Sequence, residues 1–291
     1  MSIKLNQLNT TRVFNTSNGF IVETGAGGKR VLQPDVLNLI LPNNAAAHNS
    51  VYRGRFLGTS VSAAAYVAIQ NGTFDPEDTG GLFPGDYWTI GGVNWRIGAL
   101  DFWLNYGDSA CTKHHALIVP DTNLYSAQMH KTSSGQYEAG SANTTAGGYM
   151  ATDMYLTGLA QAKTKVIDCF GAGHILTHRE YLTNAATNGY ASGATWVDST
   201  VELMTEEMVY GTVEFKNCEN AANWPYNYTI DHGQLPLFAY DRSRICNRGA
   251  WWLRDVASAT SFAYVGGDGI CGAGYAAHAH GVRPAFGICA A

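Results

Sequence analysis

The sequence predicts an α+β fold, in which strand segments come before and after two helical segments. Residues 86–90 and 93–97 are apolar-rich segments joined by Gly91-Gly92, a pattern that is typical of a β-hairpin. Residues 149–170 and 198–210 carry apolar side chains at close to helical spacing. After them, short strand-like segments alternate with long loops. The 33 glycines and the 12% of aromatic residues also favour β-structure with many tight turns.

The composition limits the partners that we expect. The chain has 291 residues, enough for one large domain or two modest ones, and only 14% of them are charged. A net charge of −5 leaves no basic patch to neutralise phosphates, so we expect no nucleic acid partner. The longest apolar runs are too short to span a bilayer, so no membrane insertion is expected. The N-terminal end is polar, with no apolar segment behind it, and we therefore expect no signal peptide.

The first 84 residues are rich in turns and short strand-like segments. Within them, residues 60–70 are helix-like, with Ser60 or Ser62 as the cap and Asn71-Gly72 as the stop. We expect a boundary at Leu82-Phe83-Pro84-Gly85. The region 1–84 is too small and too rich in turns to be an obvious enzyme, so an attachment or oligomerisation region is expected there, followed by the main domain at 85–291.

Capping residues set the helix ends that we expect in the main domain. Residues 149–170 have Thr152 or Asp153 as a cap, and Gly171 follows the last apolar residue. Residues 179–186 are expected to form a helical turn. In the second helix, at 198–210, Ser199 and Glu202 have the spacing of a capping box and Gly211 ends the pattern.

Three groups have the residue types of a catalytic or metal site without its surroundings. His174 and His178 are four residues apart, but Ile175 stands where a metalloprotease has Glu, so hydrogen-bonded structural histidines are expected. Cys111 lies near His114 and His115, which could act as its base. Neighbours on a strand point to opposite faces, however, so only one of the two histidines could do so, and a structural role is expected. Asp231, His232 and Ser243 include the types of a hydrolase triad, but the chain has no G-x-S-x-G turn. We therefore expect no catalytic residue, no metal and no cofactor.

The six cysteines are spread along the chain with no C-x-x-C pair. That spacing is wrong for a zinc knuckle or a redox motif. Free thiols are expected, with a disulfide pair as the alternative if the protein works outside the cell.

Residues 249–288 differ in composition from the rest of the chain. An aromatic block, Trp251 to Arg254, and a turn-forming block, Gly281 to Phe286, bracket a run dominated by Gly, Ala and Ser. The run from Asp255 to Gly281 has no Lys, Glu, Gln, Met or Trp, although the chain uses all five elsewhere. Small residues with occasional Tyr and His are typical of a binding surface, whereas a packed core needs Leu, Ile and Val at a fixed period.

This segment resembles the C-terminal variable region of diversity-generating retroelement proteins. The resemblance implies a C-type-lectin-like domain over roughly residues 85 to 288, of the branch that includes formylglycine-generating enzymes, with two helices and long C-terminal loops. An adenine-mutating reverse transcriptase rewrites such regions, and its products exclude the five residue types that are missing here. The diversified, ligand-binding positions implied are Ser261, Tyr264, Gly266, Gly267, Asp268, Ile270, Gly272, Ala273, Gly274, Tyr275, His278 and His280.

Around these positions, the resemblance implies a scaffold of Trp251, Trp252, Arg254, Arg283 and Phe286. Tyr264 and Tyr275 are the expected energetic anchors. For the two arginines we expect buried pairing to Asp241 or Asp255, with binding of an anionic ligand as the alternative. Calcium is left open, because a lectin-type site needs several oxygen ligands and only Asp268 lies within the small-residue run.

The function that we expect is recognition of a protein or glycan on a target cell surface. The resemblance places such a protein in a phage tail, or makes it a cell-surface or secreted product of a prophage, with several copies assembled, often three. Two alternatives stay open. One is an oxidative enzyme of the formylglycine-generating type, using Cys271 or Cys289, and the other is a purely structural phage protein.

Overall fold

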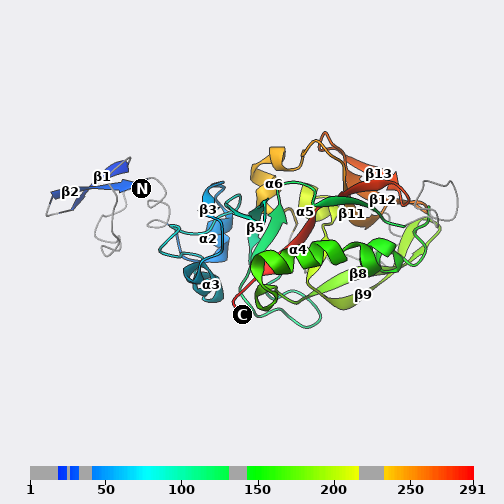
Figure 1. Cartoon of the computed structure of the whole chain (residues 1–291), viewed down its shortest axis with the longest axis horizontal. Coiled ribbons are helices and arrows are strands. Elements are labelled where there is room, and N and C mark those ends of the chain that lie inside the picture. The colour runs from blue at the N-terminus through cyan, green and yellow to red at the C-terminus, as the bar shows by residue number, and fades with distance from the viewer. Residues whose placement is uncertain (1–18, 25–26, 33–40, 131–142, 216–232) are drawn as a thin grey trace.

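The computed structural model describes residues 19–24, 27–32, 41–130, 143–215 and 233–291. In these ranges, the two largest sheets have six and five strands, with short helices and turns between the strands (Figure 1). The fold is therefore α+β, as the sequence predicts. Near the N-terminus, β1 (Gly19–Thr24) and β2 (Gly27–Leu32) form an antiparallel hairpin. No helix in the described ranges is long and apolar enough to cross a membrane.

The six-stranded sheet contains strands that are buried throughout. Every residue of β6 and of β15 is buried, as expected for strands that are covered on both faces. The β4–β5 hairpin is confirmed, and both residues of its Gly91-Gly92 turn have positive φ (58° and 78°), which glycine adopts without strain. In order across the sheet, the strands are β10 (Val201–Leu203), β15 (Pro284–Ile288), β6 (Ala116–Pro120), β5 (Val93–Leu100), β4 (Tyr87–Ile90) and β3 (Phe56–Gly58).

The five-stranded sheet is built mainly from the C-terminal segment. Its strands, in order, are β13 (Cys271–Tyr275), β12 (Ser261–Val265), β11 (Trp251–Val256), β14 (Ala279–Val282) and β7 (Tyr125–Gln128). β11 and β14 run parallel, and the other neighbours are antiparallel. The run 255–281, expected as a long loop, is therefore largely strand. Because β15 follows β14 after a single residue, this one segment belongs to both large sheets.

Two segments that the sequence pattern assigns to helix are strands. β8 (His178–Thr187) and β9 (Tyr190–Ser199) form a two-stranded antiparallel sheet, so the helical turn predicted at 179–186 is wrong. The helix predicted at 198–210 is also wrong over its first half, because β10 pairs with β15. The Ser199 hydroxyl lies 2.6 Å from Glu202 Oε1, but as a buried contact between two side chains and not as a capping box. Only α5 (Glu206–Tyr210) is helical, and Gly211 ends it in a left-handed conformation.

The helix predicted at 149–170 is regular only in its second half. A 3₁₀ turn, η2 (Tyr149–Ala151), and a π-helical turn, η3 (Met154–Gly158), precede α4 (Ala160–Phe170), which ends at Gly171 as predicted. The earlier helix prediction is confirmed by α3 (Ala63–Gln70), with Ser62 as its cap and Asn71 at its end. The remaining short elements are α2 (Ala45–Asn49), α6 (Pro236–Tyr240), η4 (Ala172–His174) and η6 (Arg242–Arg244).

Residues 41–84 pack against the six-stranded sheet. β3 pairs with β4 across the expected boundary, and Arg53 forms an ion pair of 2.6 Å with the buried Asp86. Asn49 exchanges two hydrogen bonds with the backbone of Leu100. Ile69, Phe74 and Leu82 belong to the same apolar cluster as Trp95 and Phe286. The packing of this part of the chain therefore does not divide at residue 84.

Candidate binding site

The two blocks that bracket the small-residue run are buried. All six residues of β11 are buried, and Trp251 and Trp252 are both 0% exposed. Because successive strand residues point to opposite faces, Trp251 packs with Phe238 and Leu253, whereas Trp252 packs in a different cluster, which includes Phe262. The Trp252 indole N–H donates to the Ala127 carbonyl at 2.9 Å, which ties β11 to β7.

Arg283 joins the two ends of the run. Its side chain is fully buried, with the guanidinium 4.9 Å from the centre of the Trp251 ring and 5.4 Å from that of Phe238. Nε donates to the Pro120 carbonyl (2.8 Å) and Nη1 to the Arg244 carbonyl (2.7 Å). Burial lowers the pKa of Arg283 to about 10. Among the described residues, no carboxylate forms an ion pair with it, so the expected pairing to Asp241 or Asp255 is wrong.

Arg254 pairs with a residue that the sequence argument did not select. Its Nη2 donates to Glu180 Oε2 at 2.7 Å, and Glu180 Oε1 lies 3.1 Å from His178 Nε2. Burial alone raises the pKa of Glu180, but Arg254 and His178 outweigh it and lower that pKa to about 2. Asp255 accepts a hydrogen bond from the Glu206 N–H. The expected Arg254–Asp255 pair is thus replaced by a buried bridge between β11 and β8.

The run between the blocks is much more accessible than the blocks themselves. Of the implied ligand-binding positions, the exposed ones are Asp268, Ile270, Ala273 and Tyr275. The half-buried ones are Tyr264, Gly266, Gly267, Gly272, His278 and His280. Ser261 and Gly274 are buried, so these two present little surface to a partner. The largest exposed side chains of the run are Ile270 (68% exposed) and Tyr275 (44%).

Tyr264 is held in a ring cluster and is not a freely displayed anchor. It stacks on His280 with ring centres 4.5 Å apart and planes at 21°, and Trp252 meets both rings. A Cβ on Gly272 would lie 2.7 Å from the Tyr264 ring, and one on Gly274 would lie 3.0 Å from His280 Nε2. These two glycines therefore make room for the stack. Burial, with a smaller effect of His278, lowers the pKa of His280 to about 4.

The loop at 266–270 connects β12 to β13 and is tied at several points. The Gly266 N–H donates to the Ile270 carbonyl at 2.7 Å, and the Ile270 N–H donates to the Asp268 carboxylate at 3.1 Å. Tyr210 donates its hydroxyl to the Gly269 carbonyl at 3.1 Å. Ile270 thus projects from a fixed loop, a favourable arrangement for binding because little conformational entropy is lost.

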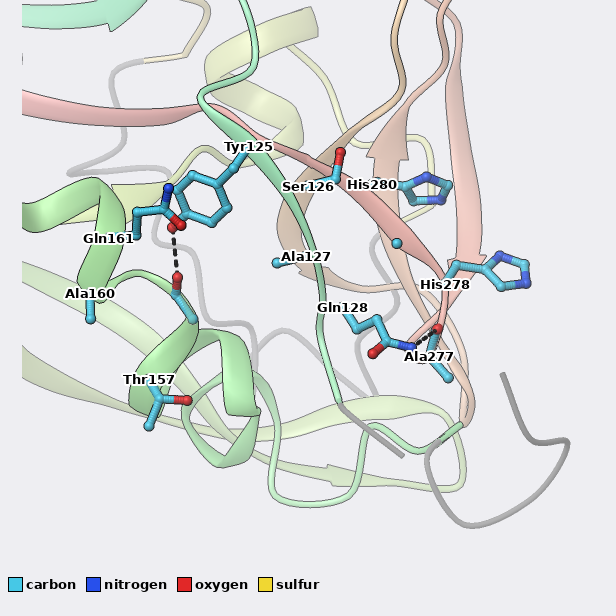
Figure 2. Close-up of a pocket in the computed structure, with 12 residues that line it drawn as sticks. Tyr125, Ser126, Ala127, Gln128, Thr157, Ala160, Gln161, Ala277, His278 and His280 are labelled. Carbon is cyan, nitrogen blue, oxygen red and sulfur yellow. Dashed lines mark hydrogen bonds between the residues drawn. The ribbon is translucent and has the colours of Figure 1, made fainter. Parts of the chain in front are cut away.

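A groove of about 940 Å³ lies beside the same sheet, between β7, the β13–β14 turn, and the segment from η3 into α4 (Figure 2). His278 and His280 line it on one side, and Tyr125 and Gln161 lie on the other. Neither β7 nor α4 was expected in the site. Both are distant in sequence from the C-terminal run and lack a distinctive motif, so only the tertiary structure brings them to it.

The histidines of the other candidate groups contact backbone groups and single carboxylates. His174 Nδ1 lies 3.0 Å from the Cys289 carbonyl, whereas His178 contacts Glu180. No group of three or more His, Cys, Asp or Glu residues in the described ranges is arranged to hold a metal ion. His114 contacts Asp101 (2.7 Å), while the buried His115 accepts a hydrogen bond from the Trp103 N–H (2.9 Å). Asp231 and His232 lie outside the described residues.

The described cysteines, Cys111, Cys169, Cys246, Cys271 and Cys289, are free thiols. Burial raises the pKa of Cys271, and the nearby carboxylates of Glu206 and Asp255 raise it further. Burial also raises the pKa of Cys289. Both thiols are therefore disfavoured as thiolates, the form in which cysteine acts as a nucleophile or metal ligand.

No family model, no curated protein and no solved structure matches this chain.

Proposed function

We propose that this chain recognises a ligand on a target cell surface through the outer part of the five-stranded sheet, formed by β12, β13 and the loops at 266–270 and 276–278. We call this surface the display surface. It is proposed to be diversified, as in the variable proteins of diversity-generating retroelements, on a C-type-lectin-like domain. The observation that carries the proposal is the contrast in burial between β11 and β15, which are buried throughout, and the run between them.

This contrast supports a division between scaffold and variable surface. Substitutions at buried positions such as Trp251 or Phe286 cost several kcal/mol, because they leave cavities. Substitutions at exposed positions such as Ile270, Ala273 or Tyr275 change the free energy of unfolding by about 0.5 kcal/mol or less. A protein that must keep its fold while its binding residues change needs this arrangement.

The side chains of the display surface support binding. Ile270 and Tyr275 are exposed on ordered backbone, and a rigid aromatic anchor gives much contact area for little entropy. A protein or a glycan is the proposed ligand, and assembly of several copies, with a trimer proposed by family analogy, makes weak single contacts effective. A phage tail or the product of a prophage is the proposed setting.

The cysteine environment supports this proposal over the enzyme alternative. Cys271 is half-buried on β13, and Cys289, the residue directly after β15, is buried. The pKa of each thiol is raised, whereas oxidative or nucleophilic cysteine chemistry needs an accessible thiolate. No feature of the described residues favours a second function.

The direct test is to sequence the encoding locus across several isolates of the source. We expect differences to concentrate in codons 255 to 281, at positions that align with adenines of a nearby template copy. The flanking codons for β11 and β15 serve as the internal control and should stay constant. Equal variation inside and outside this run would remove the argument for diversification and leave the sheet as an ordinary structural element.

A further inference from the structure

The polar groups that line the groove in Figure 2 are hydroxyls, carboxamides and imidazoles. Ser126 and Thr157 contribute hydroxyls, Gln128 and Gln161 carboxamides, and His278 and His280 imidazoles. None of the described residues that line it carries a carboxylate, an ammonium or a guanidinium group. A charged ligand would therefore lose its hydration without gaining a partner of opposite charge.

Hydrogen bonds hold Gln128 and Tyr125 in place in the groove. Gln128 donates one N–H to the Ala277 carbonyl at 2.6 Å, which fixes its carboxamide and leaves the carbonyl oxygen and the second N–H. Tyr125 donates its hydroxyl to the Gly158 carbonyl at 2.6 Å, so its ring is fixed as an apolar surface in the groove. Gln161 is exposed on the first turn of α4.

The groove is also elongated. A second hollow, of about 640 Å³, shares Tyr125 and Gln161 with it and continues along α4 to Asp168. Its lining adds one group of each charge, Asp168 and Lys165, and the Lys165 ammonium donates to the Gly91 carbonyl at 2.7 Å, so the lining as a whole stays neutral. From Thr157 to Asp168 the helical segment extends about 16 Å at 1.5 Å per residue. A ligand that uses both hollows must therefore be a chain of several units and not a single small molecule.

We propose that this groove binds a neutral oligosaccharide. Sugar hydroxyls both donate and accept hydrogen bonds, as do the hydroxyls and carboxamides of the lining, and the fixed ring of Tyr125 suits the apolar face of a sugar ring. The inference rests on the proposed function, because His278 belongs to the display surface, and it names the ligand class. Its specificity comes from β7 and α4, outside the diversified run, so different variants share one type of sugar.

An extended peptide is the competing occupant, because β7 is an edge strand and offers main-chain groups for pairing. The lining argues against it. Its apolar side chains are the alanines at 127, 160, 277 and 279 and the Tyr125 ring, so no large apolar pocket is present to anchor a peptide side chain.

The test uses the full chain and saturation-transfer NMR with maltotriose, laminaritriose, mannotriose and chitotriose. We expect at least one trisaccharide to bind. Gln161→Ala should weaken this binding about fivefold, as expected for the loss of a hydrogen bond. Ala160→Trp should abolish the binding, because the larger side chain fills the groove. Gln70→Ala is the matched control, because Gln70 is also an exposed helical glutamine but lies on α3. It should bind as the wild type does.

Three results would overturn the inference. They are absence of binding by all four trisaccharides at millimolar concentration, binding that Ala160→Trp leaves intact, and tighter binding of sialyllactose than of lactose. Binding of an end-blocked alternating Thr-Val octapeptide, weakened by Gln161→Ala, would assign the groove to peptides instead. If no sugar binds but Tyr275→Ala still abolishes attachment to cells, the groove inference fails and the proposed function stands. If a sugar binds but Tyr275→Ala leaves attachment to cells unchanged, the groove inference stands and the proposed function fails.

Discussion

The guanidinium of Arg283 lies 4.9 Å from the centre of the Trp251 ring, and both side chains are completely buried. Trp251 begins β11 and Arg283 follows β14, so this contact joins the two ends of the small-residue run. The backbone supports it, because Trp251 is paired with Gly281 and the Gly281 N–H donates to the Ala250 carbonyl at 2.8 Å. The run is therefore closed at its base, while its outer part remains accessible.

Replacing Arg283 should destabilise the whole domain. Arg283→Ala leaves a cavity beside Trp251 and removes the donors to the buried carbonyls of Pro120 and Arg244. We expect the free energy of unfolding to fall by about 3 kcal/mol or more, as measured by urea denaturation. Arg242→Ala is the control, because Arg242 is exposed on η6, and it should change the value by about 0.5 kcal/mol or less. Equal effects of the two substitutions would contradict the role assigned to Arg283.

The Glu180–Arg254 bridge should make stability fall in acid. The pKa of Glu180 is lowered from 4.5 to about 2, so the unfolded chain binds a proton at a higher pH than the folded chain does. The stabilisation is therefore complete above pH 4.5 and is lost as the pH falls from there towards 2. Urea denaturation at about pH 6, 5, 4 and 3 should show a steeper loss for the wild type than for Glu180→Gln.

The control for this acid effect is Glu77→Gln, because Glu77 is exposed. This variant should keep the steep dependence of the wild type on pH. Parallel profiles for the wild type and Glu180→Gln would mean that another group causes the loss of stability in acid.

The stack of Tyr264 on His280 should keep the imidazole neutral well below neutral pH. Burial lowers the pKa of His280 to about 4, so a histidine NMR titration should give its midpoint near that value. Because the folded form resists protonation below pH 6.5, this group makes folding less favourable as the pH falls from 6.5 towards 4. Tyr264→Ala exposes the imidazole and should move the midpoint up towards 6.5. A midpoint that Tyr264→Ala leaves unchanged would show that the stack does not shield His280.

Tyr275 should carry much of the binding to cells. We expect Tyr275→Ala to weaken attachment of the labelled protein to its target cells by about tenfold or more, with no change in the urea midpoint. Tyr190→Ala is a closely matched control, because Tyr190 is 41% exposed against 44% for Tyr275 but lies on the β8–β9 hairpin. If both variants attach equally well, the display surface is not the binding surface.

The sequence alone determined the local features of this protein. The Gly91-Gly92 hairpin, the α3 cap at Ser62, and the helix stops at Gly171 and Gly211 all follow from local backbone preferences, which act wherever the residues occur. The composition of the run 255–281, which lacks five residue types that the rest of the chain uses, likewise distinguished this segment. The aromatic block before it, expected as scaffold, lies on β11, which is buried throughout.

Only the tertiary structure decided the rest. Residues 198–203 have helical spacing but form strands, because pairing of β10 with β15 supplies their hydrogen bonds in the interior. Arg254 meets Glu180 and not Asp255, since its partner comes from a strand distant in the sequence. Gly272 and Gly274 lie against the rings of Tyr264 and His280, where a side chain would not fit. The residues of β7 and α4 come to the groove only when the chain folds. Contacts between distant segments depend on the packing of the whole chain, which no local pattern encodes.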